Sequence, residues 1–126
     1  MRYLQVFLIV LTTTLWSCKC DYCRSLTVSE FEDLITDPNI QILDVRTKEE
    51  FAEGHIQSAT NIDCNHDNFG EIAQLSLDKT RPVAIYCRRG TRSKRASCIL
   101  CKKGFRVYEL QKGLTAWIAR GKPVVK

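Results

Sequence analysis

The feature that most constrains this chain is a short apolar run that leads directly into a cysteine, a basic loop and a helix-forming segment. The run Val83-Ala84-Ile85-Tyr86 predicts a buried strand, and Cys87 follows it at once. Residues 88–93 read Arg-Arg-Gly-Thr-Arg-Ser, and a helical pattern runs from about Arg92 to Lys103. This order is typical of an α/β fold, in which reactive groups collect at the carboxyl ends of parallel strands.

The residues around Cys87 favour a reactive sulfur. A loop between a strand and a helix directs main-chain N–H groups and the positive end of the helix dipole at the cysteine. Arg88, Arg89 and Arg92 add positive charge within five residues of it. We therefore expect Cys87 to be a thiolate at neutral pH, the form in which a cysteine is a nucleophile. A structural cysteine is the alternative, but it would explain neither Gly90 nor the arginines.

The length of the loop argues against a phosphatase. Cysteine phosphatases wrap a phosphate with the pattern C-x5-R, whereas only four residues separate Cys87 from Arg92 here. The position of the phosphatase arginine holds Ser93. The tighter loop predicts a smaller bowl, which suits the outer sulfur of a persulfide better than a phosphoryl group.

Composition limits the possible functions. The 126 residues are enough for one domain, and a content of 44% hydrophobic and 26% charged residues is that of a globular protein. The formal net charge is +5, without a long basic run or interleaved aromatic residues. We therefore expect no nucleic-acid partner, and a basic surface near the cysteine favours small anionic substrates.

The first residues predict a signal peptide. Arg2 precedes an apolar run over residues 3–15, which is too short to span a bilayer. Leu15-Trp16-Ser17-Cys18 resembles a bacterial lipobox, which predicts cleavage before Cys18 and lipid attachment to it; plain secretion and an uncleaved anchor remain alternatives. We expect residues 1–17 to be a signal, 18–25 a tether and 26–126 the domain. The expected location is the bacterial cell envelope, facing the periplasm, with the protein held at the membrane by the lipid.

The other cysteines leave several interpretations open. Cys20 and Cys23 could form a local disulfide, bind a metal or have no role. Cys98 and Cys101 share one helix face and are either small buried side chains or a redox pair. Cys64 is either idle or a second thiol that resolves a persulfide.

The remaining pattern alternates helices and strands. Two capping boxes, Thr27 with Glu30 and Thr47 with Glu50, predict helix starts. The other expected elements are a strand over 40–45, a turn and a brief strand within 55–63, a helix over 69–75, a strand over 105–108 and a helix from Gly113. Such alternation indicates a parallel sheet covered by helices on both faces.

Four stretches, in the order in which they occur along the chain, resemble the rhodanese family of sulfurtransferases. They are Leu43-Asp44-Val45-Arg46, residues 49–56 (Glu-Glu-Phe-Ala-Glu-Gly-His-Ile), the loop from Cys87 to Ser93, and Gly113-Leu114-Thr115-Ala116-Trp117. The resemblance covers about residues 26–126 and implies a single rhodanese domain with a five-stranded parallel sheet. Members often have paired glycines where this chain has Lys112-Gly113, and proline where it has Asp63.

The resemblance implies that Cys87 cycles between thiolate and persulfide, without a cofactor or a metal. The donor would be thiosulfate or a similar anion, held by Arg88, Arg89, Gly90, Thr91, Arg92 and Ser93. The acceptor would be cyanide in assays, or in the cell a thioredoxin-like protein or a low-molecular-weight thiol. Asp44 and Arg46 are expected to have structural roles near the site. The charged pair Arg88 and Arg89 favours thiosulfate over mercaptopyruvate.

Two other functions remain open from the sequence. The domain could carry a persulfide or bind a redox partner without turnover, which the surplus of thiols favours. It could also be a thiol-disulfide oxidoreductase that uses Cys98 and Cys101. Neither His55, which we expect in a turn, nor His66 suggests a Cys-His dyad, and Trp117 is expected in the core or in a pocket wall.

Overall fold

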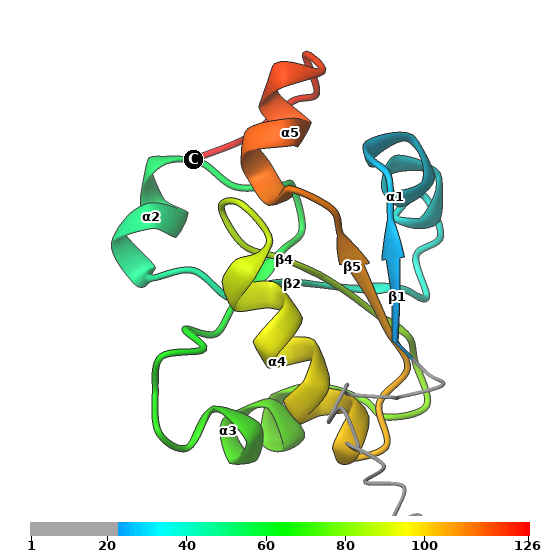
Figure 1. The fold of residues 1–126 in the computed structure, drawn as a ribbon, viewed down its shortest axis with the longest axis vertical. Helices are drawn as coiled ribbons and strands as arrows, with labels where there is room; N and C mark the ends of the chain where they lie inside the picture. Colours follow the sequence, from blue (N-terminus) through cyan, green and yellow to red (C-terminus); the bar gives the residue numbers. More distant parts are fainter. Residues whose placement is uncertain (1–22) are drawn as a thin grey trace, which may run out of the picture.

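The computed structural model describes residues 23–126, which form one α/β sandwich (Figure 1). The expected signal peptide, Cys18 and Cys20 lie outside the described residues. No helix within residues 23–126 has the length and apolar character that crossing a membrane requires.

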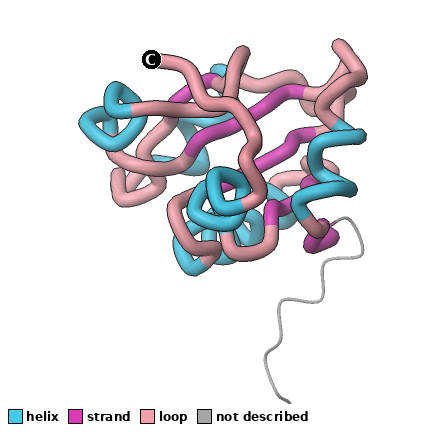
Figure 2. The backbone as a smooth tube through the Cα atoms, turned by 90° about the horizontal axis from the view of Figure 1, so that it is seen from above, coloured by secondary structure: helices cyan, strands magenta, loops and turns pink. Residues whose placement is uncertain are grey.

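The sheet has five parallel strands in the order β1-β5-β4-β2-β3. Helices cover both of its faces, and the strands run side by side between them (Figure 2). The strands are β1 (Cys23–Leu26), β2 (Gln41–Asp44), β3 (Thr60–Asn61), β4 (Val83–Tyr86) and β5 (Val107–Leu110). The helices are α1 (Val28–Leu34), α2 (Lys48–Glu53), α3 (Phe69–Ser76), α4 (Thr91–Lys102) and α5 (Gly113–Ala119). The expected fold is therefore confirmed.

Alternating residues of the central strand β4 feed two apolar clusters. Val83 and Ile85 pack with residues of α3 and α4, whereas Ala84 and Tyr86 pack with residues of α1 and α5. Cys87 continues the alternation and belongs to the first cluster. Burial on both faces explains why β4 reads as an unbroken apolar run.

The structure corrects the expected boundaries of the edge strand β1 and of its neighbour β5. Residues 23–25, expected in the tether, belong to β1, which pairs with β5 from Cys23 opposite Val107 to Leu26 opposite Leu110. β5 itself begins and ends two residues later than the expected 105–108. The reason is that the Phe105 N–H bonds the Leu100 carbonyl at the end of α4, so this residue completes the helix end instead of joining the ladder.

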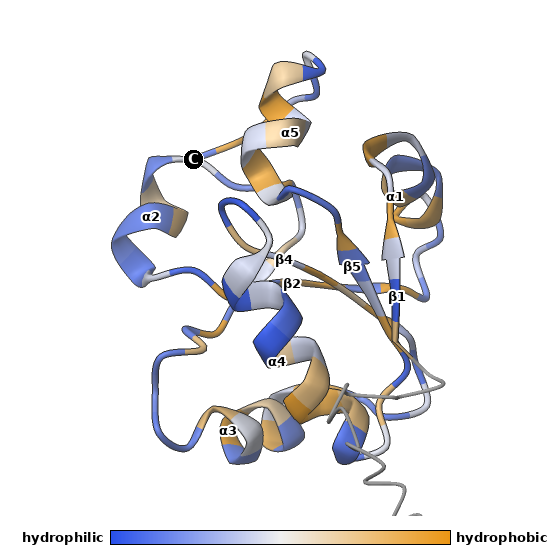
Figure 3. Ribbon diagram, in the orientation of Figure 1, coloured by the Kyte–Doolittle hydropathy of each residue, from blue (hydrophilic) through white to orange (hydrophobic). Residues whose placement is uncertain are grey.

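Both capping boxes are present as expected. Thr27 and Glu30 exchange side-chain and backbone hydrogen bonds at α1, and Thr47 and Glu50 do so at α2. The second box fixes the start of α2, a short surface helix beside the active loop, by which we mean residues 88–93. Figure 3 shows that both the loop and α2 are mainly hydrophilic.

The start of α5 holds the active loop from behind. The N–H of Leu114 donates to the Cys87 carbonyl at 2.8 Å, and the N–H of Thr115 donates to the Arg88 carbonyl at 3.0 Å. Gly113 has φ +57°, and a methyl group there would clash with the backbone of Cys87 and Arg88, coming within 2.6 Å of the Arg88 carbonyl. Lys112, the residue before it, also has positive φ, at 57°. Glycine at 113 is thus required both by conformation and by close packing.

We predict that Gly113→Ala destabilises the fold by about 3 kcal/mol, because a left-handed conformation costs about 1–2 kcal/mol and overpacking adds a similar amount. The control is Gly121→Ala, which has φ +72° but no heavy atom within 4 Å of the added methyl. That variant should lose only the conformational part. Urea unfolding of the two variants compares them, and equal losses would show that the contact with the loop does not matter.

Candidate active site

Cys87 lies directly after β4, at the carboxyl edge of the sheet, with only 1% of its surface exposed. The Gly90 N–H donates to its sulfur at 3.0 Å, and the Ser93 hydroxyl oxygen lies 3.4 Å from the same sulfur. Among the described residues these are the two hydrogen-bond partners of the sulfur. The predicted cradle therefore exists, although a single main-chain N–H of the loop reaches the sulfur itself.

Gly90 turns the chain from the loop into α4. Its φ of 104° is in the left-handed region, and it caps the twelve-residue helix that begins at Thr91. A side chain at this position would lie 3.4 Å from the backbone nitrogen of Lys112. Glycine is therefore favoured, and the positive end of α4 starts three residues from the reactive sulfur.

A hollow of about 360 Å³ opens above the sulfur and is lined by Cys87, Arg88, Arg89, Thr91 and Arg92. Four of the six expected binding residues therefore border the same opening. Gly90 and Ser93 do not line it, and both contact the sulfur directly. The hollow can receive a small anion, whereas these two residues hold the nucleophile.

Arg92 is held in an ion pair that the sequence analysis did not anticipate. Its Nη1 and Nη2 atoms donate to the two carboxylate oxygens of Glu50 at 2.7 and 2.9 Å. The Arg88 Nε lies 3.6 Å from the same carboxylate. The hydrogen bond from Arg92 lowers the pKa of Glu50 to about 2, so the pair stays charged at any physiological pH.

This ion pair distinguishes the three arginines of the loop. Arg92 is anchored, and Arg88 is partly neutralised by Glu50 although its side chain is 55% exposed. Arg89 is exposed and, within residues 23–126, has no carboxylate within ion-pair distance. Arg89 is therefore the loop cation with the most charge to offer an anion. Sequence spacing did not separate the three, because Glu50 lies in another helix.

Asp44 and Arg46 form a buried ion pair behind the site, as their expected structural roles require. Arg46 Nη2 lies 2.7 Å from Asp44 Oδ2 and also donates to the Gly54 carbonyl at 2.7 Å. The Arg46 N–H donates to Asp44 Oδ1 at 2.9 Å. These contacts join the end of β2 to the end of α2, which carries Glu50.

The other expected cysteine and histidine positions lie apart from the reactive sulfur's hydrogen bonds. Cys64 is buried, and burial raises the pKa of its thiol although Arg95 Nη2 lies 3.9 Å from the sulfur. Cys101 is buried in the α4 side of the core, and Cys98 is half-buried. His55 stacks on Phe51, with ring centroids 3.7 Å apart. It was expected in a turn, but it forms an isolated antiparallel bridge with Val125, and the turn follows at residues 57–58.

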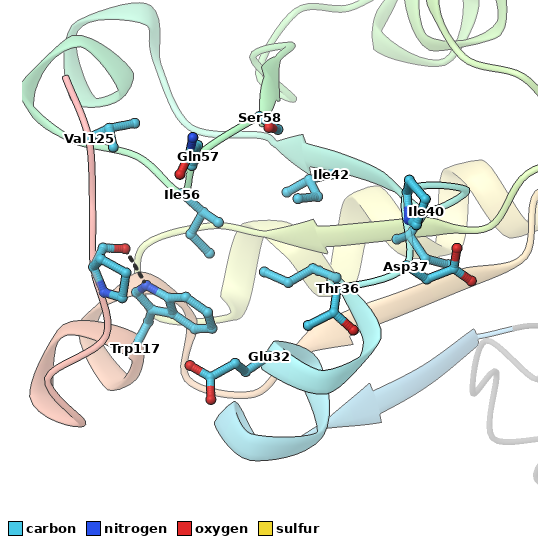
Figure 4. Close-up of a pocket in the computed structure, with 13 residues that line it drawn as sticks. Glu32, Thr36, Asp37, Ile40, Ile42, Ile56, Gln57, Ser58, Trp117 and Val125 are labelled. Carbon is cyan, nitrogen blue, oxygen red and sulfur yellow. Dashed lines mark hydrogen bonds between the residues drawn. The ribbon is translucent and has the colours of Figure 1, made fainter.

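A larger hollow of about 510 Å³ lies on the opposite face of the sheet (Figure 4). Ile42, Ile56 and Trp117 line it, and the Trp117 indole N–H donates to the Pro123 carbonyl at 2.9 Å. Trp117 is thus both core and pocket wall, as expected. Among the described residues no three His, Cys, Asp or Glu side chains are grouped as a metal site.

We predict that the Glu50–Arg92 pair stabilises the fold in a pH-dependent way. A lowered carboxyl pKa contributes stability that is complete above the ordinary value of 4.5 and is lost as the pH falls toward about 2. The difference in unfolding free energy between the wild type and Glu50→Gln should therefore shrink over that range. Urea unfolding at several pH values measures it, with Glu32→Gln in the half-exposed pair with Lys122 as control. A difference that does not change with pH would contradict the assignment.

Comparison with known proteins gives a consistent picture. Residues 27–120 match the family model described as rhodanese-like domain. The chain is 34% identical to the thiosulfate sulfurtransferase GlpE of Shewanella oneidensis over 96 residues, which cover 75% of this chain and 91% of that protein. It is 33% identical to the putative sulfurtransferase YtwF of Bacillus subtilis, over 73% of this chain and 86% of that protein.

The fold is shared with solved structures, and the domain also occurs inside longer proteins. A rhodanese-related protein of Thermoplasma volcanium superposes with a TM-score of 0.73 at 28% identity, covering 81% of this chain and 97% of that one. A tRNA uridine(34) hydroxylase of Pelagibacter ubique is 35% identical over 71% of this chain, but over only 30% of its own length. The chain therefore belongs to the rhodanese-like family.

Proposed function

We propose that the protein is a sulfurtransferase that moves sulfane sulfur from thiosulfate, or a similar anionic donor, to a thiol or cyanide through a persulfide on Cys87. The observation that carries this proposal is the buried Cys87 sulfur, held by the Gly90 N–H at the base of an arginine-lined hollow. Relatives named as sulfurtransferases support the general activity.

The reaction needs two displacements at sulfur. In the first, the Cys87 thiolate attacks the outer sulfur of thiosulfate, a new S–S bond forms, and sulfite leaves with the electron pair of the broken S–S bond. In the second, the acceptor attacks the outer sulfur of the persulfide and returns Cys87 as a thiolate. The Gly90 N–H and the α4 N-terminus stabilise the negative charge on Cys87 in each step.

Charge in the hollow favours an anionic donor. Arg89 is exposed at the rim without a carboxylate partner among the described residues, and Arg88 is only partly neutralised. Thiosulfate is an anion, so positive charge at the rim strengthens its binding. This distribution supports thiosulfate as the donor.

For the acceptor, we propose a thioredoxin-like protein or a low-molecular-weight thiol, because the hollow is open to solvent and the sulfur is at its base. We further propose that a lipid on Cys18 holds the domain at the bacterial cell envelope, facing the periplasm. The lipobox-like residues 15–18 support this location, and they lie outside the described part of the chain.

We predict that Cys87→Ser reduces thiocyanate formation from thiosulfate and cyanide to the uncatalysed rate, because the serine hydroxyl is not ionised at neutral pH. The matched control is Cys64→Ser, which removes a buried thiol that is not hydrogen-bonded to Cys87. This control should keep its activity. Near-normal turnover by Cys87→Ser would reject the proposal.

Intact mass spectrometry separates an enzyme from a carrier. A Cys87 persulfide that forms with thiosulfate but gives only one turnover with every small acceptor would indicate a carrier that needs a protein partner. Loss of activity on replacing Cys98 and Cys101, with Cys87→Ser active, would indicate a thiol-disulfide oxidoreductase.

We predict that Arg89→Ala raises the KM for thiosulfate about fivefold, the factor for about 1 kcal/mol from an exposed charge, and leaves kcat within twofold. The control is Lys102→Ala, which removes the same charge at the exposed far end of α4. Steady-state kinetics at low and high salt compares them, and salt should reduce the Arg89 effect. An equal KM change in both variants would show that only net charge matters.

A further inference from the structure

Glu109, on β5, is a buried carboxyl group that the sulfur-transfer steps do not use. Its residue surface is 1% exposed, and no basic side chain within residues 23–126 pairs with it. Its two hydrogen bonds come from serine hydroxyls: Ser25 donates to Oε2 at 2.6 Å, and Ser93 lies 3.3 Å from Oε1. A buried carboxylate normally requires a cation or several strong donors. The burial of Glu109 with two hydroxyl donors alone therefore needs a physical reason.

Ser93 connects this carboxyl group to the reactive sulfur. Its hydroxyl oxygen is fully buried and lies 3.4 Å from Cys87 Sγ and 3.3 Å from Glu109 Oε1. The Gly90 carbonyl, at 3.1 Å, is a third neighbour. A serine hydroxyl donates one hydrogen and accepts others, so it can accept from the thiol while it donates to the carboxylate. After rotation it can instead donate to the thiolate.

The carboxyl group also leads to an exposed residue that does not line the hollow. Ser25 is directly opposite Glu109 in the register of β1 and β5, and it is exposed. Cys87, Ser93, Glu109 and Ser25 therefore form a continuous line of hydrogen-bonding groups from the sulfur to solvent. A proton can leave along this line even when an anion fills the hollow.

We propose that Glu109 is a positioning residue that accepts the Cys87 proton through Ser93. The thiol proton passes to Ser93 Oγ while the Ser93 hydroxyl proton passes to Glu109 Oε1. One S–H and one O–H bond break, one serine O–H and one carboxyl O–H bond form, and the total charge is unchanged. The protonated Glu109 then donates to Ser93, whose hydroxyl donates to the thiolate. The use of this proton path in catalysis rests on the proposed function. The path adds to that function how the Cys87 nucleophile forms.

The charged groups around the Cys87 sulfur differ from those around the Glu109 carboxyl group. The sulfur faces Arg88 and Arg89 of the loop and Arg92 of α4, and Glu50 of α2 neutralises the last of these. Cys64 lies near Arg92 on the same side. Glu109 faces hydroxyl groups from β1 and α4, and the loop at Gly90. Replacing Glu109 leaves every one of the other charges in place, so a change in titration reports the carboxyl group.

The pH profile of Cys87 alkylation by iodoacetamide tests the proposal. Two groups that share a proton titrate in two steps, so the wild type should show a reactive plateau at mildly acidic to neutral pH and a second rise at alkaline pH. Glu109→Gln keeps the shape of the side chain but cannot accept the proton. Its profile should have one step instead of two, because the second group that shares the proton has been removed.

Controls separate this effect from a general change in the fold. Glu32→Gln removes a carboxylate far from the site, and Ser97→Ala removes a buried α4 hydroxyl that bonds the Ser93 carbonyl. Both should keep the two-step profile, whereas Ser93→Ala should lose it. A profile of Glu109→Gln that matches the wild type, or that is faster at every pH with the same shape, would overturn the proposal.

Infrared spectroscopy gives a second readout that needs no substrate. The wild type at neutral pH should show the carbonyl band of a protonated carboxyl group, and Glu109→Gln and Cys87→Ser should both lack it. Absence of the band in the wild type, or its presence in Cys87→Ser, would overturn the proposal. These results are independent of turnover: failed sulfur transfer with a two-step profile rejects the enzyme alone, and normal turnover with a one-step profile rejects the proton path alone.

Discussion

The proposed chemistry depends on a sulfur that is buried and yet carries negative charge. Burial alone opposes ionisation, as it does at Cys64, where it raises the pKa of the thiol. Cys87 is more buried still, but the Gly90 N–H and the start of α4 are aimed at it. In the proposed reaction, the main chain supplies the stabilisation that water provides to an exposed thiolate. The rest of the architecture serves to hold this loop in one conformation.

Two contacts brace the loop from opposite sides. The first N–H groups of α5 bond the carbonyls of Cys87 and Arg88, and the carboxylate of Glu50 clamps Arg92 from α2. The Asp44–Arg46 pair connects α2 to the sheet. Several side chains in the stretches that resemble the rhodanese family therefore support Cys87 through contacts. Most of them do not line the hollow.

Local patterns in the sequence predicted the central part of the fold well. The apolar run before Cys87 and the capping box at Thr47 each contain their own signal, so β4 and α2 appear where expected. β1 was missed because its residues are polar and half-exposed, and it is a strand only through its pairing with β5. The start of β5 was misplaced because Phe105 is apolar but is used by the end of α4.

The residues of the candidate site also differ in whether local sequence patterns can reveal them. Cys87 and Gly90 could be found because strand, loop and helix follow one another in the chain. The role of Glu50 toward Arg92 could not, since the two are 42 residues apart and meet only when α2 is placed. Glu109 lies one residue beyond the strand expected over 105–108, so no local pattern placed it in the sheet. Its burial follows from β1, the strand that sequence patterns did not reveal.

The order of the chain gives the bracing by α5 a further meaning. Cys87 emerges during synthesis well before residues 113–119, whose N–H groups complete the hold on its loop. A growing polypeptide therefore contains this thiol before the helix that braces its loop has been made. The loop gains its last backbone contacts only when α5 docks.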